Sequence, residues 1–71
     1  MANLKVQFGR RLRTLRKRVD LTQEDLAENT GLTIESISNM ERGIFGPKFD
    51  NLEKIANVID VEVKELFDFN P

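Results

Sequence analysis

The chain has 71 residues, of which 39% are hydrophobic and 32% charged, and it contains neither cysteine nor histidine. This length predicts one domain, residues 1–71, and the composition excludes disulfide cross-links and ordinary zinc sites. The formal net charge of −1 and the pI of about 5.4 argue against a protein that coats nucleic acid indiscriminately. Every acidic side chain lies beyond residue 18, however, and the strongly basic residues 1–18 leave one basic edge.

The basic N-terminal segment is predicted to form the first helix. Its apolar residues recur at spacings of three and four, which is typical of one helical face: Leu4, Phe8, Leu12, Leu15 and Val19. At about 100° per residue, Arg10, Arg13 and Lys17 point away from that face. Arg16 falls at the edge of the apolar face, an unusual place for a free charge.

The second helix is predicted to begin after Thr22, which fits an N-cap. Asp25, three residues later, gives a weaker form of the capping box, in which Glu or Gln is preferred. Leu26 and Ala27 face inward. Gly31 ends the helix because glycine readily adopts the positive φ that other residues resist.

The third helix is predicted to run from its N-cap, Thr33, to Gly43. Ile37 and Met40 form its inward side, and Ile34 lies between its two faces. The outward side is a polar stripe of Glu35, Ser38, Asn39 and Arg42.

Two further helices are expected after a loop over residues 44–49. The fourth presents four apolar side chains on one side: Leu52, Ile55, Ala56 and Ile59. Asp50 and Glu53 can form its capping box unless Phe49 is already helical. The last is short, around residues 63–67, and the ending DFNP is expected to fray. The pattern predicts an all-α fold, a compact bundle of five short helices.

The second and third helices together indicate a DNA-binding unit. Two helices joined by a short glycine-containing turn form the helix-turn-helix, whose second helix enters the major groove. Such a helix needs one apolar side to hold it on the domain and one side with hydrogen-bonding groups for base edges. The third helix has this division.

The motif TQ-x-x-LA-x-x-x-GL-x-x-x-x-IS-x-x-ERG, from Thr22 to Gly43, resembles the helix-turn-helix core of the lambda repressor and Cro family (XRE-type) of bacterial and phage regulators. FGRRLRTLRK resembles the family's first helix, the G-P-x-F-x-x-L-x-K-I-A pattern of residues 46–56 its fourth, and VEVKELF its fifth. The likeness covers nearly the whole chain and implies a lambda-repressor-like fold.

The resemblance implies contacts with double-stranded DNA. The matching base-reading positions are Ile34, Glu35, Ser38 and Asn39. Asn39 can pair with adenine, Glu35 can accept from a cytosine amino group, and Ile34 can touch a thymine methyl. Many family members carry an uncharged polar residue where Glu35 stands, so the target sequence stays open. The matching phosphate-binding positions are Gln23, Arg42, Lys48 and Asn51, with Arg10, Arg13 and Lys17 as weaker candidates.

The family also implies structural roles for residues of the first three helices. Ala27 and Gly31 match small residues that let the second and third helices cross closely. Arg16 and Glu41 match an ion pair that joins the first helix to the end of the third. Loss of one partner from a buried pair costs roughly 3–5 kcal/mol.

A homodimer is expected because one such domain reads only a half-site. Small controller proteins of restriction–modification systems, which this chain resembles in length, dimerise through the last helix. The candidate contacts are Val61, Val63, Phe67 and Phe69; alternatively, Val63, Leu66 and Phe67 only cap the core.

The resulting hypothesis is a DNA-binding transcriptional regulator, most simply a repressor, that occupies a near-palindromic operator. The alternative is a protein-interaction module such as an antitoxin or a bridging factor, which the acidic pI and Glu35 favour. No enzyme activity, cofactor, metal, small-molecule ligand or signal peptide is expected from these motifs, and no apolar run reaches the roughly 20 residues of a membrane span. A cytoplasmic location is expected.

Overall fold

A computed structural model describes residues 3–70, which form four α-helices and one 3-10 helix. They are α1 (Leu4–Arg18), α2 (Gln23–Thr30), α3 (Ile34–Glu41), α4 (Phe49–Ile59) and the 3-10 helix η1 (Val63–Phe67). Between residues 3 and 70 there is no strand, which confirms the all-α prediction. The last element is a 3-10 helix rather than an α-helix. Residues 68–71 were expected to fray, and of these Pro71 lies outside the described residues.

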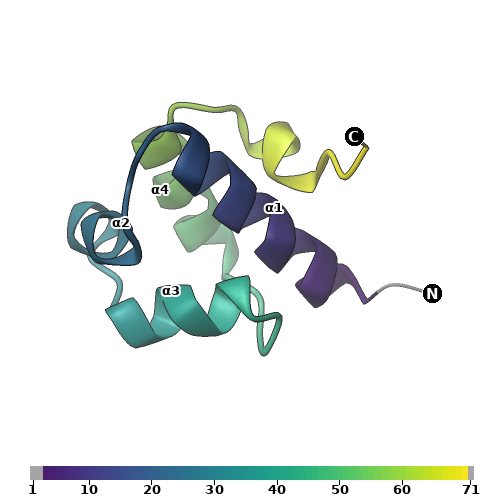
Figure 1. The fold of residues 1–71 in the computed structure, drawn as a ribbon, viewed down its shortest axis with the longest axis horizontal. Coiled ribbons are helices and arrows are strands. Elements are labelled where there is room, and N and C mark those ends of the chain that lie inside the picture. The colour runs from purple at the N-terminus through teal and green to yellow at the C-terminus, as the bar shows by residue number, and fades with distance from the viewer. Residues whose placement is uncertain (1–2, 71) are drawn as a thin grey trace.

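Helix α1 runs through the middle of the molecule, with α3 on one side of it and η1 with the C-terminal segment on the other (Figure 1). All five elements contribute to one core, which consists of Phe8, Leu12, Leu15, Leu26, Ala27, Ile37, Met40, Leu52, Ile55, Ala56, Ile59 and Leu66. The apolar face predicted for the first helix is buried only in its middle part: Leu4 is 58% exposed, and Val19, the C-cap residue, is 42% exposed. They lie at the two ends of α1, where the other elements no longer cover the helix.

The caps of the helix-turn-helix match their predictions. The Asp25 backbone N–H donates to Thr22 Oγ1 at 2.9 Å, and the Thr22 N–H donates to Asp25 Oδ2 at 3.0 Å. The hydrogen bond from the Thr22 backbone N–H, and after it the interaction with the Thr22 side chain, lower the pKa of the Asp25 carboxyl below its ordinary value. Gly31 follows α2 with φ of +79°, and the Ser36 N–H donates to Thr33 Oγ1 at the start of α3.

Of the two alternatives for the start of α4, the structure confirms that Phe49 is already helical, and the capping box of Asp50 and Glu53 does not form. The helix begins at Phe49, so Lys48 occupies the N-cap and makes no side-chain bond there, while Asp50 is already the second helical residue. Phe49 does not join the core: its side chain is 89% exposed.

Close contact between helices depends on a glycine that the sequence patterns did not single out. A Cβ atom at Gly9 would stand 2.3 Å from the Met40 carbonyl oxygen and 2.8 Å from that of Glu41, so only glycine lets α1 approach the end of α3. Gly31 was expected to serve a close crossing of α2 and α3. That expectation is wrong, because nothing lies within 4 Å of the Cβ position at Gly31, and its role is the positive φ alone.

Candidate nucleic-acid interface

The outward side of α3 presents a polar surface held on an apolar base. Ile37 and Met40 are buried and fix the helix on the core. The polar stripe consists of Glu35, Ser38, Asn39 and Arg42, of which Ser38 and Asn39 are half-buried and the two charged residues exposed. Ile34, at the first turn, is 48% exposed beside this stripe. A helix anchored on one side and polar on the other can supply donors and acceptors to base edges.

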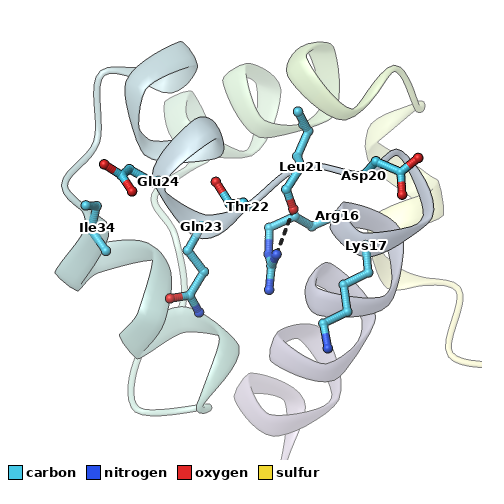
Figure 2. Close-up of a pocket in the computed structure, with 8 residues that line it drawn as sticks. All are labelled: Arg16, Lys17, Asp20, Leu21, Thr22, Gln23, Glu24 and Ile34. Carbon is cyan, nitrogen blue, oxygen red and sulfur yellow. Dashed lines mark hydrogen bonds between the residues drawn. The ribbon is translucent and has the colours of Figure 1, made fainter.

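Two grooves flank α3. The first, of about 480 Å³, lies between the end of α1 and the start of α2, and it brings together Lys17, Gln23 and Ile34. Figure 2 shows the Arg16 side chain between those of Gln23 and Lys17 in this groove. The second groove, of about 290 Å³, brings Lys48 and Asn51 together beside the loop that follows α3. Of the expected phosphate contacts, Gln23 lines the first groove and Lys48 and Asn51 line the second, whereas Arg42 belongs to the polar stripe and lines neither.

An ion pair fastens α3 to α1. Arg16 Nε donates to Glu41 Oε2 at 2.6 Å and Arg16 Nη2 donates to Glu41 Oε1 at 3.0 Å, and the two side chains are only 8% and 3% exposed. Arg16 Nη1 donates to the Leu21 carbonyl at 2.7 Å, the bond drawn in Figure 2. The hydrogen bonds and the charge of Glu41 raise the pKa of Arg16 above its ordinary value, so the guanidinium stays charged.

Gln23 belongs to the same network. Its Nε2 donates to Glu41 Oε1 at 3.1 Å, so one carboxylate links α3 to both α1 and the first residue of α2. Within residues 3–70, every buried side-chain nitrogen and oxygen has a hydrogen-bond partner. The network fixes the start of α2 relative to α3, which sets the spacing between the first groove and the polar stripe.

Sequence reasoning missed two hydrogen bonds, one donated by Gln23 and one donated by Arg11. The bond from Gln23 to Glu41 was missed because the resemblance supplied a role in phosphate binding for Gln23, and no periodicity joins residues 18 apart in sequence. Arg11 Nε donates to the Glu65 carbonyl at 2.9 Å and ties α1 to η1. Charge patterning cannot predict that bond, because its acceptor is a backbone oxygen.

The remaining predicted residues lie elsewhere on the surface. Arg10 and Arg13 are exposed on α1 but line neither groove beside α3. The dimer candidates lie at the end of the chain: Val61 packs against the core, Val63 and Phe67 are each 38% exposed, and Phe69 is half-buried. Phe67 also stacks on Phe8 with 5.4 Å between ring centroids, so it serves the core as well as the surface.

Comparison with known proteins identifies the family. The helix-turn-helix family HTH_3 matches residues 12–66. The chain is 37% identical to control protein C.BamHI of Bacillus amyloliquefaciens over 68 residues, which cover 94% of this chain and 84% of that protein. It is also 37% identical to control protein C.MunI of a Mycoplasma species, over 94% of this chain and 92% of the relative.

Solved structures agree with this assignment. The controller protein C.AhdI from Aeromonas hydrophila is similar with a TM-score of 0.86 and 41% identity, over 89% of this chain and 96% of that one. The biofilm regulator SinR, solved in complex with DNA, is similar with a TM-score of 0.81 and 34% identity, over 86% of this chain and 98% of that one. The fold is therefore lambda-repressor-like, and these relatives are control proteins and regulators. The chain belongs to the XRE-type helix-turn-helix family of transcriptional regulators.

Proposed function

We propose that the protein is a repressor that binds a near-palindromic operator as a homodimer, with α3 of each copy in a major groove. The observation that carries this proposal is the polar stripe of α3, which is anchored by buried residues and flanked by two grooves that are lined by Gln23 on one side and by Lys48 and Asn51 on the other. Base edges are read in the major groove, whereas phosphates fix the register.

Ile34, Glu35, Ser38 and Asn39 are proposed to read bases. Gln23 and Arg42 are proposed to bind phosphates, together with Lys48 and Asn51 in the second groove. The amide of Gln23 already donates one hydrogen to Glu41, so its second N–H and the backbone at the start of α2 remain for the phosphate.

A dimer is proposed because half-sites lie about 34–36 Å apart along one face of the duplex. The domain is 33 Å long and 21 Å wide, dimensions of the same order as that spacing. The proposed contacts are Val61, Val63, Phe67 and Phe69.

Selection from a pool of randomised duplexes at physiological salt tests this function. Enrichment of a two-fold symmetric site with half-sites one helical turn apart is expected. In the selected site, Asn39→Ala should cost roughly 1–3 kcal/mol at one base position and relax specificity there. Lys48→Ala should weaken binding to all sequences about equally. Repression is then tested with a reporter gene under a promoter that overlaps the selected site.

Only weak and salt-sensitive binding, without an enriched site, would contradict the proposal. That result would favour the alternative, an antitoxin or bridging module. The exposed carboxylate of Glu35, in the middle of the proposed reading surface, is the feature that favours such a module.

A further inference from the structure

A third groove, of about 440 Å³, lies on the other side of α1 from α3, between α1 and the C-terminal segment. Three arginines of α1 line it: Arg10, Arg11 and Arg18. It shares no residue with the two grooves beside α3. A domain that docks α3 on DNA leaves this groove on the side of α1 that faces away from the duplex.

The arginines of this groove are not neutralised by ion pairs. In the part of the chain that the structure describes, the basic side chains paired with carboxylates are Arg16 and Lys64, and neither lines the groove. Among residues 3–70, the carboxylate that lines the groove is that of Asp68, whose Oδ1 accepts from the Asn70 N–H at 3.3 Å. Three guanidinium groups against one carboxylate leave an excess of positive charge in a concave surface, which favours an anion.

The geometry of the arginines favours a phosphate-bearing anion. Arg11 uses its Nε on the Glu65 carbonyl, which holds the side chain in place and leaves its two terminal nitrogens as donors. Planar guanidinium groups match phosphate oxygens with two parallel hydrogen bonds. Arg18 follows Arg11 by about two turns on the same side of α1, and Arg10 lines the groove beside them, so together they can hold more than one phosphate group.

An aromatic ring borders the arginines. Phe69 lines the groove and packs edge-on against Phe67, with 6.3 Å between ring centroids, and Phe67 stacks on buried Phe8. The ring of Phe69 is therefore supported from the core while it remains partly accessible. Aromatic faces of this kind stack on planar bases. The volume falls within the range of roughly 300–1,000 Å³ that small-molecule pockets occupy.

We propose that the groove lined by Arg10, Arg11, Arg18 and Phe69 binds a nucleoside polyphosphate, with the phosphates on the arginines and the base on Phe69. The site is separate from the DNA-binding surface, and its proposal does not depend on the operator or the sign of regulation. It shares Phe69 with the proposed dimer contacts, so ATP and a second copy of the chain compete for that ring. It gives a function to the part of the basic segment that the helix-turn-helix does not use.

Titration of the isotopically labelled full chain, without DNA, with ATP and separately with inorganic pyrophosphate tests the proposal by two-dimensional amide NMR. Saturable shifts are expected along α1 at residues 10–18 and at residues 68–70, with ATP binding several-fold more tightly than pyrophosphate. Arg18→Gln should weaken both probes by about tenfold, as expected for one charge-assisted bond. The matched control, Lys54→Gln, removes the same charge from the exposed side of α4 and should leave both affinities unchanged.

Phe69→Leu separates the two halves of the site. It should weaken ATP but not pyrophosphate, because only ATP carries a base to stack. Three results would overturn the proposal: no saturation at millimolar ATP, shifts centred on Arg16 and Gln23 instead, or equal affinities for wild type and Arg18→Gln. Because DNA is absent, failure here leaves the operator selection unaffected, and failure of that selection leaves this titration unaffected.

Discussion

Replacing Gly9 with alanine tests how α3 is held against α1. The added methyl group would meet two backbone oxygens of the last turn of α3, at 2.3 Å and 2.8 Å. Backbone atoms cannot rotate away as a side chain would, so α1 and α3 must separate. Overpacking of this kind lowers the free energy of unfolding by roughly 1–3 kcal/mol. Because the added methyl group meets backbone atoms, we expect a loss at the upper end of this range for Gly9→Ala.

Alanine also has an intrinsic advantage over glycine of about 1 kcal/mol within a helix, and Gly9 is helical. The net expected loss is therefore about 2 kcal/mol of unfolding free energy. For a small domain whose urea m-value is about 1 kcal/mol/M, the unfolding midpoint should fall by about 2 M. The chain has no tryptophan or tyrosine, so far-ultraviolet circular dichroism is the suitable signal for the urea titration.

Two other glycines supply controls for Gly9→Ala. Gly46→Ala meets no atom within 4 Å and has no positive φ, so its stability should stay within about 0.5 kcal/mol of the wild type. Gly31→Ala also meets no atom, but its φ of +79° costs an alanine about 1 kcal/mol. If Gly9→Ala unfolds at the same urea concentration as the wild type or a higher one, the described contact between α1 and α3 is wrong.

Three further predictions concern the ion pair, the α2 cap and the dimer. Arg16→Met leaves the buried carboxylate of Glu41 without its cation and should cost roughly 3–5 kcal/mol in urea unfolding; a loss below 1 kcal/mol would show that the pair does not hold α3. The pKa of Asp25 is lowered in the folded chain, so its carboxylate contributes stability above its unfolded pKa near 3.8, and this contribution disappears as pH falls through the lower folded value. Asp25→Asn should therefore be less stable than the wild type at neutral pH and lose less stability on acidification below pH 3.8; parallel pH profiles of thermal unfolding for the two proteins would refute this. Val63→Glu places a charge on the proposed dimer surface at a side chain that is 38% exposed, so it should shift the protein toward monomer in sedimentation equilibrium without loss of helical signal; an unchanged association constant would exclude Val63 from the interface.

The sequence predicted the elements that local chemistry determines. The Thr22 cap, the positive φ of Gly31 and the apolar side of α4 follow from residue type and spacing, and the structure has all three. These features depend on neighbours within about one helical turn, which a single sequence displays directly.

The features that were missed depend on contacts between distant segments. In the sequence, Gly9 is only a residue of low helix propensity, because its contact with the end of α3 is not visible there. Leu4 completes the apolar pattern of α1, although its side chain is 58% exposed. Phe49 fitted the family pattern, but its side chain remains almost fully exposed at the first position of α4. Periodicity shows which side of a helix is apolar, but it cannot show how far along the helix the neighbouring elements extend.

The burial of the Arg16–Glu41 pair has a consequence for how the protein responds to ions. Dissolved salt screens exposed charges over about 8 Å at physiological ionic strength, but it screens buried pairs much less. The phosphate contacts proposed for exposed side chains such as Arg42 and Lys48 should therefore weaken as salt rises, while the bonds that orient α3 persist. A rise in ionic strength should release the protein from DNA with its reading helix still in place. The released protein can then rebind without refolding, and the same geometry is available for each successive encounter with DNA.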